Sequence, residues 1–193
     1  MKEYGDNSLE KHIIAAAFRV LVKKNISGTR IHLIAEEADM GTSHIHYYFK
    51  TKKGLLMAVL NEIQRRSSER RRNIMAANGD GLSGSLNSFF KSKEVMISNE
   101  RDYDTVQIDF WVHGLVDEDI RKLCMRSYNI WREDICSALE KHAPDMPPGK
   151  RKILACVMVS MMMGASLQFL QDESVFALEE YFAFCLDMVI NAI

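Results

Sequence analysis

Residues 42–48 concentrate side chains that can donate and accept hydrogen bonds: two hydroxyls, two imidazoles and two phenols around a single isoleucine. Groups of these kinds can contact the base edges and phosphate oxygens of DNA. The segment follows a three-residue break at 39–41, and a short apolar helix is expected before it, over 31–38. Two short helices around a sharp break are typical of a helix-turn-helix, whose second helix enters the major groove.

The inner face of such a unit must be apolar so that the two helices can pack on a neighbour. The residues expected on that face are Ile31, Ile34, Ala35, Ala38 and Ile45. Any pair of short helices can show this spacing, so the pattern alone does not decide between a DNA-binding unit and ordinary packing.

The flanking segments also read as helices. The first is expected over residues 9–24, with Ser8 as its N-cap and Asn25 at its end. Thr29 is expected to cap the helix at 31–38, and Thr51 a long helix over 52–77. No segment shows strand-like alternation, and all three prolines lie between 144 and 148, so the chain is predicted to be all-α.

Charge is distributed unevenly along the chain. Residues 1–77 carry 14 Lys and Arg against 8 Asp and Glu, whereas residues 78–193 carry 11 against 18. A basic N-terminal part suits a polyanion, and the acidic remainder indicates a different task.

Four ordered segments resemble the TetR family of repressors: Ile14–Phe18, Thr29, Ile34–Ala38 and Tyr47–Leu56. The resemblance implies a three-helix DNA-binding domain, a C-terminal helical bundle with about nine helices in all, a two-fold dimer and a sensor for a small ligand.

The chain departs from the family pattern in two places, the turn and the recognition helix. Asp39 stands where a turn glycine is usual, and Asp can adopt the left-handed conformation more easily than most residues. Gly41 takes the position of the usual Ser cap, and His46 that of the first Tyr of the recognition helix. These changes leave the expected fold intact, but the operator sequence cannot be inferred from the family pattern.

The resemblance assigns DNA contacts position by position. The residues carried over are Thr29, Arg30, Thr42, Ser43, His44, His46, Tyr47, Tyr48, Lys50 and Lys52. Two other interpretations stay open: Tyr48 and Phe49 as core residues, and His44 and His46 as solvated side chains. His44 and His46 do not share a helix face, so no metal site is expected.

The domain boundary is predicted near the start of the long helix, with residues 1–56 for DNA binding and 57–193 for ligand binding and dimerisation. A loop is expected at 78–81, and further helices are expected over 82–98, 102–113, 118–141, 150–171 and 175–193. The arginines at 65–66 and 70–72 are interpreted as a solvated helix face.

Aromatic residues at helical spacing in the C-terminal part could line a ligand pocket, although plain core is the usual role of such residues. The candidates are Phe89, Tyr103, Phe110, Trp111, Tyr128, Trp131 and Phe169. Segments 109–111 and 119–132 resemble the BetI branch of the family, named for a choline-responsive repressor. Aromatic faces favour a hydrophobic or cationic ligand. Asp104 and Asp109 could add charge, but a surface position is the simpler interpretation.

Residues 153–170 form an uncharged stretch, which fits either the centre of a bundle or, less well, a membrane span. The four widely spaced cysteines indicate reduced thiols in a cytoplasmic protein. No motif of an enzyme, cofactor or metal site is present.

The leading hypothesis is therefore a cytoplasmic, homodimeric repressor. It binds a near-palindromic double-stranded operator and responds to a small-molecule effector. The alternatives are a helical DNA-binding or interaction module without ligand sensing, and a membrane-anchored helical protein.

Overall fold

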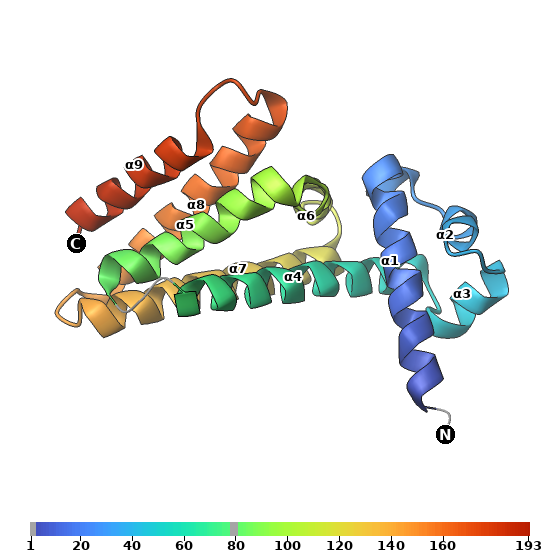
Figure 1. Cartoon of the computed structure of the whole chain (residues 1–193). Helices are drawn as coiled ribbons and strands as arrows, with labels where there is room; N and C mark the ends of the chain where they lie inside the picture. Colours follow the sequence, from blue (N-terminus) through green and yellow to red (C-terminus); the bar gives the residue numbers. More distant parts are fainter. Residues whose placement is uncertain (1–2, 78–80) are drawn as a thin grey trace. The chain divides into compact units, whose positions relative to one another are not determined.

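The structure, a computed structural model, describes residues 3–77 and 81–193 (Figure 1). These residues form nine helices and no strand, which confirms the all-α prediction. Of the predicted loop at 78–81, residues 78–80 lie outside the described residues, and Gly81 is the N-cap of the helix that follows it. The helices are α1 (Glu3–Gly28), α2 (Ile31–Glu37), α3 (Thr42–Tyr48), α4 (Lys52–Ala77), α5 (Leu82–Asn99), α6 (Arg101–His113), α7 (Glu118–His142), α8 (Pro148–Gln171) and α9 (Leu178–Asn191).

The chain divides into two compact units. The first comprises Met1–Arg65 and Thr105–Cys124, and the second comprises Arg66–Asp104 and Met125–Ile193. Helices α4, α6 and α7 each contribute residues to both units. The predicted division at residue 56 concerns function rather than packing and stays a prediction.

In the first unit, side chains of α1 bind the C-terminal end of α2. The imidazole Nε2 of His12 lies 3.0 Å from the carbonyl oxygen of Ala38. Glu37 forms ion pairs with Lys23 at 2.8 Å and Arg19 at 2.6 Å, and these bonds lower the pKa of the Glu37 carboxyl. Four of the five predicted inner-face residues are buried: Ile34, Ala35, Ala38 and Ile45.

Helix ends in this unit follow local backbone chemistry. Asn25 has φ 56° and Asp39 has φ 52°, so both predicted breaks adopt the left-handed conformation. Gly41 is the N-cap of α3, and the hydroxyl of Thr51 accepts the Gly54 N–H at 3.0 Å, as predicted for α4.

Two predicted helix starts are wrong. Helix α1 begins at Glu3, so Ser8 lies inside it rather than at its N-cap. Helix α2 is capped by Arg30, not Thr29. The Thr29 hydroxyl donates instead to the carbonyl oxygen of Asn25, four residues earlier, at 2.7 Å.

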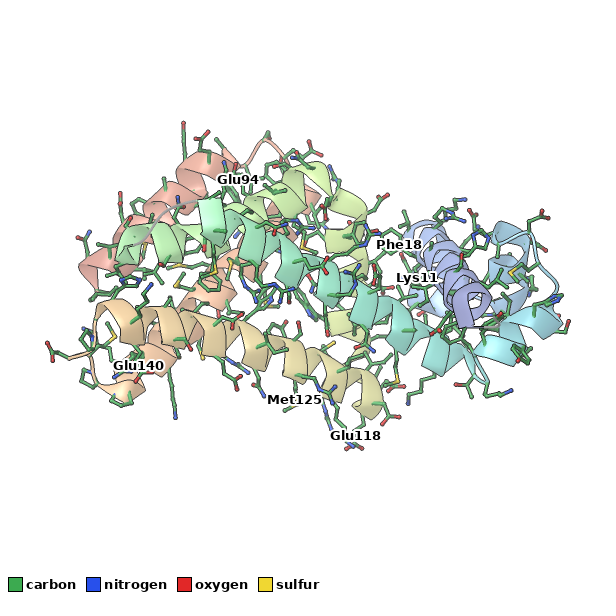
Figure 2. The ribbon with its side chains drawn as sticks, turned by 60° about the horizontal axis from the view of Figure 1, so that its bottom comes forward. Lys11, Phe18, Glu94, Glu118, Met125 and Glu140 are labelled. Atoms are coloured by element: carbon green, nitrogen blue, oxygen red, sulfur yellow. The ribbon has the colours of Figure 1, made fainter. Side chains whose placement is uncertain are left out.

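The second unit is built on α5, which packs against both α8 and α9, and these two pack on each other (Figure 1). The rings of Phe90 and Phe182 stack across α5 and α9 with centroids 5.5 Å apart. Helix α7 turns its apolar side to this core, since Trp131, Ile135 and Leu139 are buried. Met125 and Glu140 project from the outer side of the same helix (Figure 2).

Helix α8 has the length and apolar composition of a membrane span, a combination also found in core helices of soluble bundles. One side of it belongs to the core, through Leu154, Ala155, Met158, Met162 and Ala165. The helix is therefore a core element of the second unit, with 39% of its apolar window buried.

All four cysteines are free. Burial raises the pKa of the Cys124 thiol to about 11, so this side chain is a protonated, unreactive core residue at neutral pH.

The N-terminus of α7 offers a test of local stability. Asp117 Oδ1 accepts the Asp119 and Ile120 N–H groups at 3.0 and 3.1 Å. We expect Asp117→Ala to destabilise the protein by about 1 kcal/mol, because two helix-end donors lose their acceptor. The measurement is the midpoint of urea unfolding followed by circular dichroism.

Asp117→Asn is the matched control, since its side-chain oxygen can still cap the helix. The pKa of Asp117 is lowered by the Ile120 N–H bond and by Lys53. The stabilisation is therefore complete above the ordinary value of 3.8 and is lost as pH falls through the lower folded value. An unchanged midpoint for Asp117→Ala at pH 7 would contradict the capping role.

Candidate nucleic-acid interface and ligand cavity

Helix α3 presents one apolar residue inward and its polar residues outward. Ile45 is fully buried, whereas Tyr47 is 68% exposed. The other predicted contact residues of the helix are also exposed: Thr42, Ser43, His44 and His46. The structure thus leaves all of these predicted contact side chains accessible, with only Ile45 turned inward.

Aromatic and cationic groups continue this face beyond the end of α3. The rings of Tyr47 and Tyr48 meet edge to face with centroids 5.2 Å apart, and Tyr48 is half-buried. The exposed Lys50 ammonium lies 5.9 Å from the Tyr47 ring centroid. Phe49 is buried and belongs to the core. Phenol and ammonium groups so placed can donate to phosphate oxygens.

The remaining predicted contacts lie where α1 meets α2 and α4. Thr29 is fully buried, so its side chain does not reach the surface in this conformation. Arg30 is exposed, and its guanidinium donates to the carbonyl oxygens of Ser27 at 2.6 Å and Thr29 at 3.0 Å.

Lys52 also has a structural partner. Its ammonium donates to the carbonyl oxygen of Ile26 at 2.9 Å. Partial burial, and secondarily the charge of Arg30, lower the pKa of Lys52. An ammonium has three donors, so a phosphate contact remains compatible with this bond.

The backbone of Ile26 is held from its other side by Asp109 of α6. The Ile26 N–H donates to Asp109 Oδ2 at 2.6 Å. The left-handed Asn25 interrupts the helix, and the N–H that follows therefore needs an acceptor outside it. Asp109 faces this backbone rather than a ligand pocket, a role that sequence reasoning missed because 83 residues separate the two groups.

The second unit contains a small cavity of about 20 Å³, roughly the room that one water molecule needs. Two of the predicted ligand residues, Phe89 and Trp131, lie in its wall. The complete lining is Ser67, Arg70, Arg71, Phe89, Ser92, Lys93, Met96, Trp131 and Met162.

The other predicted ligand residues lie elsewhere. Phe110 and Trp111 belong to the first unit, where Phe110 is fully buried. In the second unit the Arg66 guanidinium lies over the Tyr103 ring, 5.1 Å from its centroid. Tyr128 and Phe169 are partly buried against the core.

Sequence reasoning also missed the cations of this cavity. The interpretation of 70–72 as a solvated helix face is wrong for Arg71, which is 6% exposed, and holds for the exposed Arg72. Lys93 is also buried and pairs with the fully buried Asp104. A weak sign was available, since Lys93 follows Phe89 and Phe90 at helical spacing on the apolar side of α5.

The fold and the exposed polar side chains of α3 together define a helix-turn-helix. Residues 13–59 match the model of "Bacterial regulatory proteins, tetR family". This match confirms the predicted resemblance to the family for the N-terminal part of the chain.

Curated relatives are described as transcriptional regulators and not as enzymes, in agreement with the sequence-based expectation. The HTH-type regulator YttP of Bacillus subtilis is 40% identical over 55 residues, which cover 28% of this chain and 27% of that protein. The BetI regulator of Vibrio parahaemolyticus is 27% identical over 112 residues, covering 58% and 56%. The chain thus matches between about a quarter and just over half of these relatives' length.

Solved structures share the fold over nearly the whole chain. A transcriptional regulator from Saccharomonospora viridis, determined in complex with choline, superposes with a TM-score of 0.82 at 19% identity. The match covers 96% of each chain. At this identity the likeness shows the fold alone.

The bond between Asp109 and Ile26 can be tested directly. We expect Asp109→Ala to cost about 1–3 kcal/mol, because it leaves a partly buried N–H without its acceptor. Amide hydrogen exchange at Ile26, followed by NMR, should accelerate in proportion.

Asp109→Asn is the control, since its amide oxygen can still accept the bond. It should keep most of the protection, with a smaller loss for the missing charge. Equal exchange at Ile26 in all three proteins would show that the bond does not form in solution.

Proposed function

We propose that this protein is a ligand-responsive transcriptional repressor that binds a double-stranded DNA operator through α3. The exposed polar face of α3 above the buried Ile45 is the observation that carries the proposal. Four of its side chains can meet base edges: Thr42, Ser43, His44 and His46. Phosphates can be met by Tyr47, Tyr48, Lys50 and Lys52. The description of its relatives as transcriptional regulators supports this role and a cytoplasmic location.

The operator is proposed to be a near-palindrome, because the protein is proposed to act as a symmetric dimer. An apolar stripe on α8 and α9 supports dimerisation. Ile153, Val157 and Leu167 of α8 are 65, 38 and 48% exposed, and Phe184 and Met188 of α9 are 66 and 49% exposed. Side chains this apolar commonly mark an interface when they form a contiguous exposed patch.

Small residues continue the α8 stripe. Ser160 follows Val157 by three residues, and Gly164 follows Ser160 by four. Open space lies beside Gly164. A second copy can therefore approach the α8 backbone closely. Ala165, the next small residue, is buried in the core and does not belong to this stripe.

Ligand sensing is the less supported part of this function. A ligand changes operator affinity only if it binds one conformation of the protein better than another. A cavity of about 20 Å³ holds no organic effector without expanding, which favours the second candidate, a DNA-binding module without a sensor. The buried charges around the cavity favour the sensor.

The test of the proposed function is selection of bound DNA from a random pool by the purified protein. A repressor of this kind should enrich a near-palindrome with half-sites about one helical turn apart or slightly more. Enrichment of no sequence would contradict the proposal. Repeating the measurement with candidate effectors distinguishes the two candidate functions, because only a ligand-responsive repressor changes its operator affinity when an effector is added.

We expect His44→Ala to change which bases are selected, because His44 stands exposed at the start of the recognition helix. Loss of one base contact should cost about 1–3 kcal/mol at that position of the operator. Selection with the variant, followed by binding titrations on both operators, measures the effect.

Lys50→Ala is the contrasting variant. It should weaken binding to every sequence and lower the slope of log affinity against log salt by about one unit. The same is expected of Lys52→Ala, but Lys52 also holds Ile26, so Lys50 gives the cleaner result. An unchanged slope for both variants would mean that the phosphate-contacting surface lies elsewhere.

For assembly, we expect Phe184→Asp to convert a micromolar dimer into a monomer, since a buried unpaired charge is costly at an apolar interface. Analytical ultracentrifugation gives the measurement. Met125→Asp is the matched control, because Met125 of α7 is 52% exposed but lies off the α8 and α9 stripe. A wild-type protein that sediments as a monomer would refute the dimer.

A further inference from the structure

The cavity of the second unit is lined by positive charge. Arg70 and Arg71 come from α4 and Lys93 comes from α5, and no carboxylate stands in the wall. The rest of the lining is four apolar side chains and two serines. A cationic ligand here would find no carboxylate in the wall to pair with, which disfavours the quaternary amines suggested by the aromatic residues alone.

Each cation has a carboxylate partner behind the wall, but the three partners differ in exposure. Lys93 pairs with the fully buried Asp104, whereas Arg70 pairs with Glu100 and Arg71 with Asp134. The side chains of Glu100 and Asp134 are 34 and 44% exposed, against 13 and 7% for their arginines. An incoming anion could therefore release either carboxylate to water while keeping the buried guanidinium neutralised.

The hydrogen bonding around the cavity is incomplete. Arg70 Nη1 is buried and has no hydrogen-bond partner. A buried charged donor without an acceptor costs free energy, so it favours a conformation or a ligand that supplies one.

The two arginine pairs also separate the cavity from the surface. Arg70 and Glu100 line an open depression of about 460 Å³, and Arg71 and Asp134 line another of about 510 Å³. In the second depression Arg71, Arg72, Lys141 and His142 face the single carboxylate of Asp134. This side attracts anions, and Arg71 belongs to both the depression and the cavity.

We propose that the cavity is the contracted form of a binding site for a small amphiphilic carboxylate, which displaces Asp134 from Arg71. The carboxylate group of the ligand binds the Arg71 guanidinium, with Arg70 beside it. Its apolar body takes the space between Phe89, Trp131 and the unbranched Met96 and Met162, whose side chains can rotate to enlarge the cavity.

The Arg71 guanidinium already lies 5.5 Å from the Phe89 ring centroid, so the carboxylate site is partly preorganised. The inference rests on the sensing part of the proposed function and names its ligand class.

The experiment uses isothermal calorimetry on the full chain without DNA, so its outcome does not depend on operator binding. The probes are hexanoate and octanoate, with hexyltrimethylammonium and octyltrimethylammonium as partners matched in chain length. We expect the carboxylates to bind and the ammonium compounds to bind at least tenfold more weakly.

Arg71→Met should weaken carboxylate binding roughly tenfold or more, because it removes a charge-assisted bond of the head group. Arg72→Met is the matched control: it is the next residue on α4, lines only the depression and should change affinity less than threefold. Circular dichroism of each variant checks folding.

Asp134→Asn distinguishes a loss of binding from a loss of folding, because it should strengthen carboxylate binding whereas Arg71→Met should weaken it. Removing the competing carboxylate should tighten octanoate binding severalfold. Binding of the ammonium probes alone, binding of neither class, or weaker binding by Asp134→Asn each overturns the proposal. If operator selection succeeds while any of these results is obtained, the proposed DNA-binding function is still supported and only the ligand class is refuted.

Discussion

The peptide group of Ile26 is the constraint on which the first unit depends. A left-handed Asn25 interrupts α1, and the backbone that follows must find partners outside its own helix. Asp109 of α6 accepts its N–H, and Lys52 at the start of α4 donates to its C=O. One residue thus ties together α1, α4 and α6, and α1 in turn packs against α2 of the helix-turn-helix.

The same constraint would link the proposed DNA binding to the proposed ligand sensing. Helix α4 carries Lys52 in its first turn and Arg70 and Arg71 in its later turns, so one helix holds both the Ile26 bond and the cavity cations. A displacement of α4 or α6 would strain the bonds at Ile26. Linkage of this kind needs only two conformations that differ in these contacts.

The second unit shows how charge and apolar packing share one interior. Its core is continuous from α5 through α8 to α9, yet Lys93 and Asp104 are buried beside it as an ion pair. Such a pair contributes little net stability, because desolvation of the two charges offsets their attraction. The buried charges around the cavity are therefore better explained by ligand binding than by stability, and they support our inference of an anionic ligand.

The sequence by itself determined the all-α fold, the helix-turn-helix and most helix ends, because these depend on local chemistry: helical periodicity, capping oxygens at Thr51 and Asp117, and left-handed conformations at Asn25 and Asp39. It misplaced the cap of α2 and the solvated side of α4. Only tertiary structure decided that Asp109 meets Ile26, that Arg71 and Lys93 turn inward, and that Phe110 and Trp111 lie apart from Phe89 and Trp131. The physical reason is that these contacts join residues tens of positions apart, whose proximity depends on how the helices pack rather than on any local pattern.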